Sequence, residues 1–94
     1  MTDIDNKEFG GERPLFGSEN LRLDKVIFHA GESALKNCRN IEASRCRFEG
    51  KYPFWHVDGF VVENCEFTSG ARAALWYSRG LRMSDTIVDA PKMF

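Results

Sequence analysis

The chain has 94 residues, which suits one small domain. Its 13 lysine and arginine residues against 14 acidic residues leave a formal net charge of −1, so the charge gives no reason to expect a nucleic-acid or membrane partner. The polar first residues lack the apolar segment of a signal peptide, and no apolar run is long enough to span a membrane, so we expect a cytoplasmic protein.

Residues 1–19 are predicted to form an N-terminal arm and cap. They carry five acidic residues against two basic ones. Solenoid proteins need polar caps on their terminal coils, and Phe9, Leu15 and Phe16 are apolar enough to lie over a first coil.

From Asn20 onward the chain contains a degenerate repeat of about twenty residues. The stretches NLRLDKVIF, NIEASRCRF, GFVVENCEF and GLRMSDTIV begin at Asn20, Asn40, Gly59 and Gly80, with spacings of 20, 19 and 21 residues. In each one, apolar and polar residues alternate as in two short strands, and the two polar residues between these strands mark a turn of the chain. The repeat predicts an all-β fold, a short right-handed single-stranded parallel β-helix of about four coils. The predicted coils are residues 20–39, 40–58, 59–79 and, in part, 80–94.

Stacked coils place equivalent side chains directly above one another. One inward ladder should contain Phe28, Phe48 and Phe67. A further apolar column at Leu35, Phe54 and Leu75 predicts a third strand in each coil, and hence a triangular cross-section. On the outside, we expect charge pairs between coils: Arg22 with Glu42, Arg47 with Glu66, and Asp58 with Arg39 and Arg79.

A leucine-rich repeat is the structural alternative, because its pattern also fits Phe60 to Phe67 in a repeat of similar length. Such a repeat would include a helical or extended return after Phe48 and Phe67. Gly50, Pro53, Gly70 and the bulky column at Phe54 favour a third strand there instead.

The segments FGGERPLFGSENLRL, GKYPFWHVDGF and GARAALWYSRGLRMSDTIVDAPKMF resemble a bacterial family, the domain of unknown function 3737 family. The likeness covers about residues 9–94. It implies a fold like that of the pectate-lyase-like right-handed β-helices. Members have been labelled virulence factors or hydrogenases, with no established activity to carry over. The family tends to be longer, so this chain resembles its N-terminal part.

The most unusual local composition lies in the segments YPFWHVD and ALWYSR, which occupy equivalent positions of two neighbouring coils. Flat aromatic faces beside charged hydrogen-bonding groups suit sugar rings. The candidate ligand-binding residues are Trp55, His56, Asp58, Arg72, Trp76, Tyr77 and Arg79. The alternative is that these rings only pack between coils. Strand alternation does not decide whether His56 and Tyr77 face inward or outward.

The best functional prediction is a non-catalytic scaffold or a weak carbohydrate-binding module. The alternative is a carbohydrate-active enzyme of the pectate-lyase type, or a fragment of one. Glu32, Glu49 and Asp58 are the carboxylates near the aromatic segments, but their spacing matches no catalytic signature, so we assign no catalytic residues.

The cysteines are Cys38, Cys46 and Cys65, an odd number without metal-binding spacing. We expect free thiols, with Cys46 and Cys65 stacked in one inward column, and no metal or cofactor.

We also expect a homo-oligomer. Residues 81–94 offer no evident cap for the last coil, and two copies meeting there around a two-fold axis would form a closed dimer. The acidic N-terminal cap should prevent stacking from head to tail.

Overall fold

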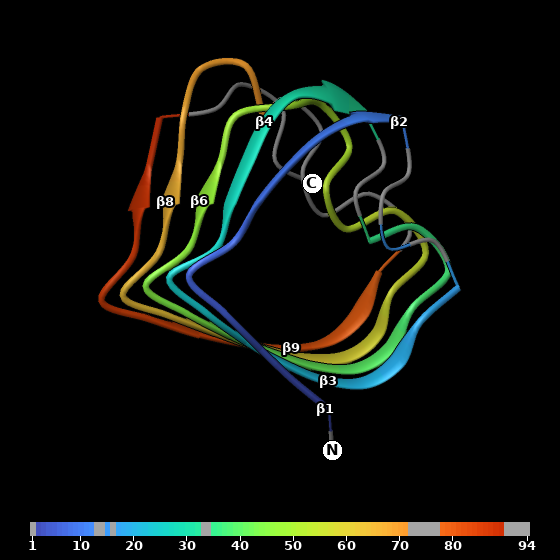
Figure 1. The fold of residues 1–94 in the computed structure, drawn as a ribbon. Helices are drawn as coiled ribbons and strands as arrows, with labels where there is room; N and C mark the ends of the chain where they lie inside the picture. Colours follow the sequence, from blue (N-terminus) through green and yellow to red (C-terminus); the bar gives the residue numbers. More distant parts are fainter. Residues whose placement is uncertain (1, 13–14, 16, 33–34, 72–77, 90–94) are drawn as a thin grey trace.

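The computed structural model describes residues 2–12, 15, 17–32, 35–71 and 78–89. These residues form two parallel five-stranded sheets and no helix (Figure 1). Successive strands alternate between the two sheets, so each turn of the chain adds one strand to each sheet. We call one turn of the stack a rung.

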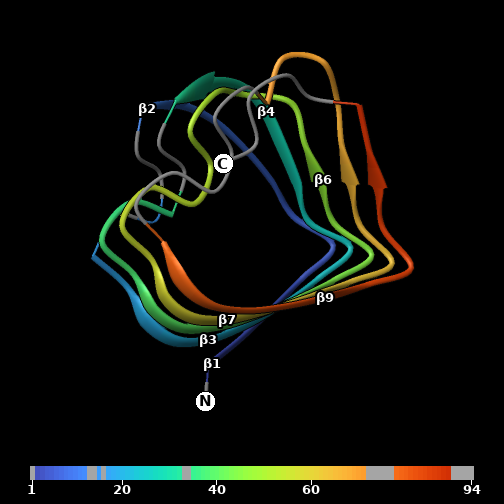
Figure 2. The same cartoon turned by 180° about the vertical axis from the view of Figure 1, so that it is seen from behind.

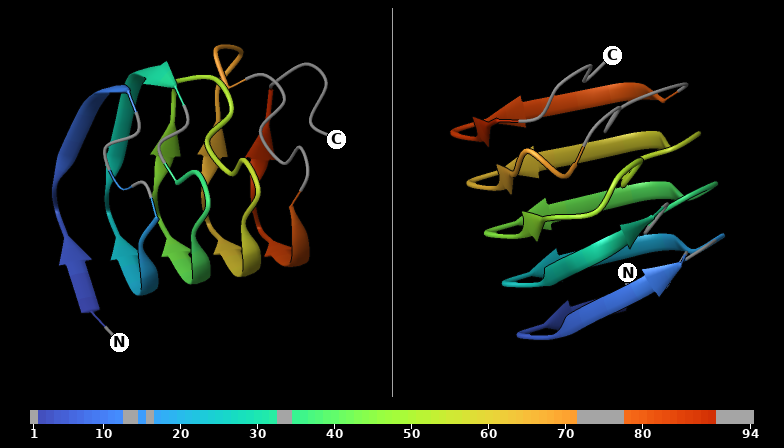
Figure 3. Two further views of the ribbon diagram at one scale, coloured as in Figure 1. Left: turned by 90° about the vertical axis from the view of Figure 1, so that its right-hand side faces the viewer. Right: turned by 90° about the horizontal axis from the view of Figure 1, so that it is seen from above.

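The first sheet contains β1 (Thr2–Asp5), β3 (Glu19–Asp24), β5 (Arg39–Ser44), β7 (Asp58–Glu63) and β9 (Arg79–Ser84). The second contains β2 (Glu8–Glu12), β4 (Ile27–Glu32), β6 (Arg47–Phe48), β8 (Glu66–Phe67) and β10 (Ile87–Val88). The same stack is seen from behind in Figure 2, and its rungs lie side by side along one axis in Figure 3. The parallel β-solenoid predicted from the repeat is confirmed, and the described residues show no helical return of a leucine-rich repeat.

The N-terminal segment adds a rung to the four repeats that the sequence aligns. Residues 1–19 were expected to form an arm and cap, but they include β1 and β2. Strand β1 pairs in parallel with β3, with Ile4 beside Leu23, and β2 pairs with β4, with Phe9 beside Phe28. The stack therefore begins with a rung whose outer edge is open within the described residues.

Stacked phenylalanines form the centre of the core. The rings of Phe9, Phe28, Phe48 and Phe67 follow one another with centroid distances of 5.6, 5.1 and 4.9 Å and nearly parallel planes. Phe54 packs against Phe48 from the third side of the coil. This ladder, which the repeat predicts, excludes water because Phe48, Phe54 and Phe67 are fully buried.

The chain turns its corners with residues in the left-handed region. The corner between the two sheets is formed in successive rungs by Asn6, Lys25, Arg45, Asn64 and Asp85, with φ between 47° and 56°. A second corner uses Asn20 and Asn40, then Gly59 and Gly80, and the Asn40 amide donates a 2.7 Å hydrogen bond to the Asn20 side-chain oxygen. Asparagine and glycine suit these positions because they adopt positive φ at low cost.

The third side of the coil differs from the prediction. Instead of a third strand, residues 35–37 and 53–56 form turns, so the triangular coil with three strands is wrong in the described residues. The reason is that Asn37 and His56 have φ of 57° and 56°, which bends the backbone out of an extended path. The turns still stack: the Leu35 amide donates to the Pro53 carbonyl and the Asn37 amide to the Trp55 carbonyl, both at 2.9 Å.

Charged ladders cover the outside of both sheets. Arg22 lies between Asp3 and Glu42, at 3.6 Å from each carboxylate, and Arg47 lies 3.9 Å from Glu66. The expected pairs of Arg22 with Glu42 and of Arg47 with Glu66 are thus present. Because the pairs are exposed, each contributes at most about 1 kcal/mol, and they act mainly on the register of neighbouring coils.

Candidate functional site

The aromatic segment forms a tight turn on the third side of the coil. Phe54 and Val57 are buried, Trp55 is half-buried and His56 is exposed. Strict alternation would have turned His56 inward. The left-handed backbone at His56 instead places two successive side chains, those of Trp55 and His56, toward the outside.

Ser78 of the next coil holds this turn in place. Its hydroxyl donates a hydrogen bond to the Phe54 carbonyl and accepts one from the Val57 amide at 3.0 Å. These two backbone groups are the ones that flank Trp55 and His56. Two coils earlier, the Cys38 thiol makes the equivalent contact, donating to the Leu15 carbonyl at 3.2 Å. A small polar side chain at this position therefore joins two of the turns to the coil that follows them, while the rung between them has Val57 there.

A surface depression of about 340 Å³ lies beside the turn, lined by His56, Val57, Asp58 and Arg79. Asp58 and Arg79 are neighbours on β7 and β9, and the Arg79 guanidinium donates to the Asp58 carboxylate at 3.2 Å. Both side chains are exposed, so each keeps hydrogen-bonding capacity toward the depression. The site thus offers an imidazole, a carboxylate and a guanidinium within one small concave surface.

The Trp55 ring is supported by its neighbours. Tyr52 meets it edge to face, with ring centroids 5.1 Å apart and an angle of 69°, and His56 lies at 5.9 Å and 67°. The Lys51 ammonium lies 5.8 Å from the centre of the Tyr52 ring. These contacts orient the indole, as expected if the rings are packing groups. Trp55 remains partly exposed, one residue before His56, which lines the depression.

The structure brings together four of the predicted ligand-binding residues: Trp55, His56, Asp58 and Arg79. The other three, Arg72, Trp76 and Tyr77, lie outside the described residues, as does Leu75 of the third apolar column. Of the three carboxylates considered from the sequence, Asp58 lines the depression. Glu49 is engaged elsewhere, by Arg47 at 2.9 Å and His29 at 3.2 Å, and the side chain of Glu32 lies outside the described part.

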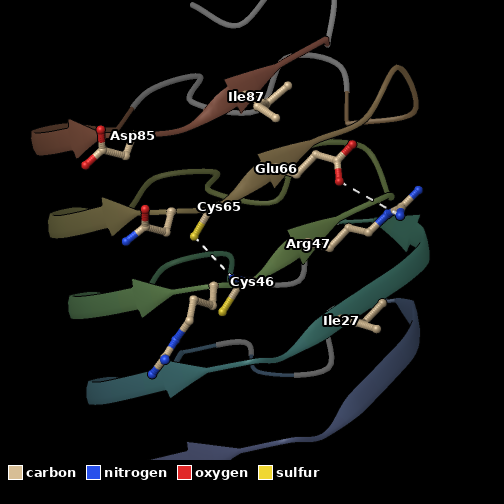
Figure 4. A pocket seen from close by; sticks show the side chains of 9 residues that line it. Ile27, Cys46, Arg47, Cys65, Glu66, Asp85 and Ile87 are labelled. Atoms are coloured by element: carbon tan, nitrogen blue, oxygen red, sulfur yellow. Dashed lines mark hydrogen bonds and ion pairs between the residues drawn. The ribbon is translucent and has the colours of Figure 1, made fainter.

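A second depression, of about 480 Å³, follows the corner between the two sheets (Figure 4). Its two sides are columns of outward residues. One column contains the corner residues Arg45, Asn64 and Asp85, and the other contains Ile27, Arg47, Glu66 and Ile87 of the second sheet. Its lining residues are Ile27, Arg45, Cys46, Arg47, Asn64, Cys65, Glu66, Asp85 and Ile87. Arg45 is held by a bidentate pair with Asp24, at 2.7 and 2.8 Å. This depression was not predicted from the sequence, although the residues of each side occupy one column of the repeat.

His29 lies on the outer face of β4 between two carboxylates of neighbouring rungs. Its Nε2 is 2.5 Å from a Glu8 oxygen and its Nδ1 is 3.2 Å from a Glu49 oxygen. The hydrogen bonds to Glu8 and to Glu49 raise the pKa of His29. Within the described residues, no group of three or more His, Cys, Asp or Glu side chains is arranged to hold a metal ion.

The three cysteines are free and buried, as the sequence predicts. Burial raises the pKa of the Cys38 thiol to about 11. Cys46 and Cys65 are stacked in one column, where the Cys46 amide donates to the Cys65 sulfur at 3.4 Å, and the side-chain hydrogen bond to Cys65 together with burial raises the pKa of Cys46. These thiols pack as small apolar groups with weak hydrogen bonds.

The stacked parallel rungs and their inward ladders define the protein as a β-solenoid. Residues 2–94 match the family described as "Protein of unknown function (DUF3737)", and the chain belongs to this family. No curated protein and no solved structure matches the chain. Among the described residues, there is no helix with the length and apolar character needed to cross a membrane.

Proposed function

We propose that the protein is a non-catalytic β-solenoid scaffold that binds carbohydrate weakly at the Trp55 turn. The observation that carries the proposal is the depression formed by His56, Asp58 and Arg79, with the partly exposed Trp55 directly before His56 in the chain. An aromatic face supports the apolar side of a sugar ring, and the charged pair hydrogen-bonds the hydroxyl groups at its rim.

The rigid support of the turn favours binding over a purely structural role for Trp55. Ser78 fixes the backbone on both sides of Trp55 and His56, so little backbone freedom of the turn remains to be lost when a ligand binds. The depression is small and open. We therefore expect dissociation constants of about 1 mM, equivalent to about −4 kcal/mol.

The alternative is a carbohydrate-active enzyme of the pectate-lyase type. Hydrolysis of a glycosidic bond usually requires two carboxyl groups facing the scissile bond. Among the described residues, the depression at the Trp55 turn is lined by one carboxylate, Asp58, which is paired with Arg79. This arrangement supports a binding surface and gives no support to a catalytic centre.

Three further features belong to the same proposal. We place the protein in the cytoplasm of a bacterium, in keeping with its largely polar composition and its resemblance to a bacterial family. The solenoid is related to the pectate-lyase-like right-handed β-helices. The chain corresponds to the N-terminal part of the family's pattern.

Tryptophan fluorescence tests the binding. In a Trp76→Phe background, Trp55 is the remaining tryptophan, because the chain has two. Titration with a panel of soluble neutral and acidic oligosaccharides should change its emission with a saturable curve. Arg79→Met should weaken binding, whereas Arg22→Met, which removes an exposed arginine from another column of the same sheet, should leave the curve unchanged. A flat response to the whole panel would contradict the proposal, and the appearance of new reducing ends would replace it with the enzyme.

A further inference from the structure

Two thiols meet in the column that follows the corner between the two sheets. Cys46 and Cys65 are 19 residues apart in the chain and occupy equivalent positions of neighbouring rungs. Figure 4 shows their sulfur atoms one above the other, each turned toward the preceding rung. The contacts agree, because the Cys46 thiol donates to the Leu23 carbonyl at 3.7 Å. The Cys65 thiol likewise donates to the Ala43 carbonyl at 3.5 Å. The spacing of the rungs therefore sets the separation of the two sulfur atoms.

This spacing matches the span of a linear complex with two thiolates. Neighbouring strands lie about 4.8 Å apart. A bond between a thiolate sulfur and a metal such as zinc is about 2.3 Å long, so two such bonds on opposite sides of one ion span about 4.6 Å. Thiolates suit Cu(I), zinc and iron–sulfur clusters. Zinc and the clusters take four ligands, whereas Cu(I) accepts two in a line. Two stacked thiols therefore fit Cu(I) best.

The surrounding backbone accommodates the loss of both thiol protons. The Cys46 thiol also donates to the Ser44 carbonyl at 3.3 Å, and the Cys65 thiol does the same to the Glu63 carbonyl at 3.2 Å. Each of these carbonyls accepts a second hydrogen bond, at 3.1 Å, from a backbone amide at the corner of the preceding rung. The carbonyls therefore keep a partner when the thiols are deprotonated. The Cys46 amide donates to the Cys65 sulfur at 3.4 Å, and such a donor stabilises a thiolate.

The column itself does not require sulfur. Thr86 follows Cys65 in the next rung, and its hydroxyl makes the same two backbone contacts as the Cys65 thiol. It accepts from the Cys65 amide at 3.4 Å and donates to the Ser84 carbonyl at 2.8 Å. Val26, one rung before Cys46, is fully buried without a polar side-chain atom. Threonine and valine therefore meet the structural needs of this position, and the two thiols stand in adjacent rungs, where they can share one ion.

The pair lies close to solvent. Cys46 and Cys65 are among the residues that line the second depression. They are 3% and 4% exposed, whereas Cys38 is completely buried. An ion that enters the depression therefore comes close to the pair, and the solenoid needs to open only locally for the ion to bind.

From this geometry we propose that Cys46 and Cys65 form a two-coordinate site for Cu(I). One ion lies between the two sulfur atoms. Two S–H bonds break, two Cu–S bonds form, two protons pass to solvent, and the copper stays univalent. The spacing of the cysteines in the chain matches no metal-binding motif, because the solenoid brings these two ligands together at a distance of one coil. The site is independent of carbohydrate binding at the Trp55 turn.

A copper competition measures the binding. The reduced protein is titrated under anaerobic conditions into Cu(I) held by the chelator bicinchoninate. It should remove one ion per chain from the chelator and gain a thiolate-to-copper charge-transfer absorption in the ultraviolet. A pH indicator in weakly buffered solution should report two protons released per ion. X-ray absorption of the loaded wild-type protein should show two sulfur neighbours around the copper, a result that needs no variant.

Three cysteine variants locate the site. Cys46→Ser and Cys65→Thr each remove one ligand, and each should abolish the copper uptake and the ultraviolet absorption. Thr86 shows that this column accepts a hydroxyl, so both variants should fold. Cys38→Ser is the matched control, because it removes a buried thiol from another column, in which Ser78 occurs naturally two coils later. It should leave the uptake unchanged. Circular dichroism spectra identical to wild type verify the folding of all three.

Four results would overturn the proposal. Copper left entirely with the chelator by the folded wild-type protein would show that the two thiols only pack. Uptake that survives Cys46→Ser or Cys65→Thr would place the copper elsewhere. Uptake lost in Cys38→Ser, or a ratio of one ion to two chains, would show a site that uses other ligands or joins two molecules. Nitrogen ligands or a third sulfur in the X-ray absorption of the loaded protein would exclude the two-coordinate site.

Discussion

The Ser78 hydroxyl donates a hydrogen bond to the Phe54 carbonyl of the preceding coil and so connects the core ladder to the exposed turn that follows it. Phe54 is buried against Phe48, and the residue after it is Trp55. The position of the candidate binding surface is therefore fixed by one side chain from the next rung.

Ser78→Ala removes both hydrogen bonds of this hydroxyl, including the one accepted from the Val57 amide. We expect a loss of about 1 to 3 kcal/mol in the free energy of unfolding, because buried backbone groups lose their partner. Trp55 emission should also change. Ser78→Cys should retain most of the stability, since Cys38 makes the equivalent contact two coils earlier. Urea denaturation measures the difference, and equal losses for both variants would show that the hydrogen bonds do not matter.

Phe48→Ala opens a cavity at the centre of the phenylalanine ladder, where Phe48 contacts Phe28, Phe54 and Phe67. The expected cost is about 3 to 5 kcal/mol, enough to unfold a small domain. Phe9→Ala is the matched control at the end of the same ladder, and it should cost less because Phe9 is only partly buried. Thermal melts compare them. A melting temperature for Phe48→Ala within a degree or two of the parent would contradict the register.

Lys25 occupies the corner between the two sheets with φ of 56°, where the first and fourth rungs have Asn6 and Asn64. A lysine in the left-handed region costs more than an asparagine. Lys25→Asn should therefore raise the free energy of unfolding by about 0.5 to 1 kcal/mol, provided that the unfolded chain is little affected. Lys25→Ala, which removes the same side chain without the asparagine preference, should bring no gain. Identical melting temperatures for the two variants would rule out the backbone explanation.

The pKa of His29 is raised by its hydrogen bonds to Glu8 and Glu49. Protonation of His29 therefore stabilises the fold. This stabilisation is present in full below the pKa of an unfolded histidine, about 6.5, and is lost as the pH rises through the higher pKa of the folded state. An NMR titration of the ring should show a midpoint above 6.5, and Glu8→Gln combined with Glu49→Gln should lower it. A midpoint unchanged by the double substitution would show that these carboxylates are not its partners.

The sequence predicts the inner rungs well because their apolar columns repeat. Leu21, Ile41 and Phe60 fall in one column, and all are buried. The first rung escaped detection because Thr2 occupies that column and Lys7 the inward position next to the corner. A repeat is recognised by its apolar columns, and these two polar residues interrupt the columns in the first rung.

The site was predicted only in part, for a reason of backbone geometry. Trp55 and Asp58 stand out by composition, but the outward orientation of His56 depends on a left-handed φ. Asn37 occupies the same column one coil earlier, and Gly17 two coils earlier. Both residue types favour positive φ, so the repeat already indicated a left-handed residue at this position. The role of Ser78 was not visible, because its acceptor lies in the preceding coil at a different position of the repeat.

A two-dimensional NMR titration of the isotope-labelled protein with the oligosaccharide panel tests the proposed function most directly, because it reports every residue at once. The account predicts saturable shifts at Trp55, His56, Asp58 and Arg79, with no comparable shifts around His29 on the other sheet. Shifts confined to residues away from the depression, or none with any sugar, would contradict carbohydrate binding at the Trp55 turn.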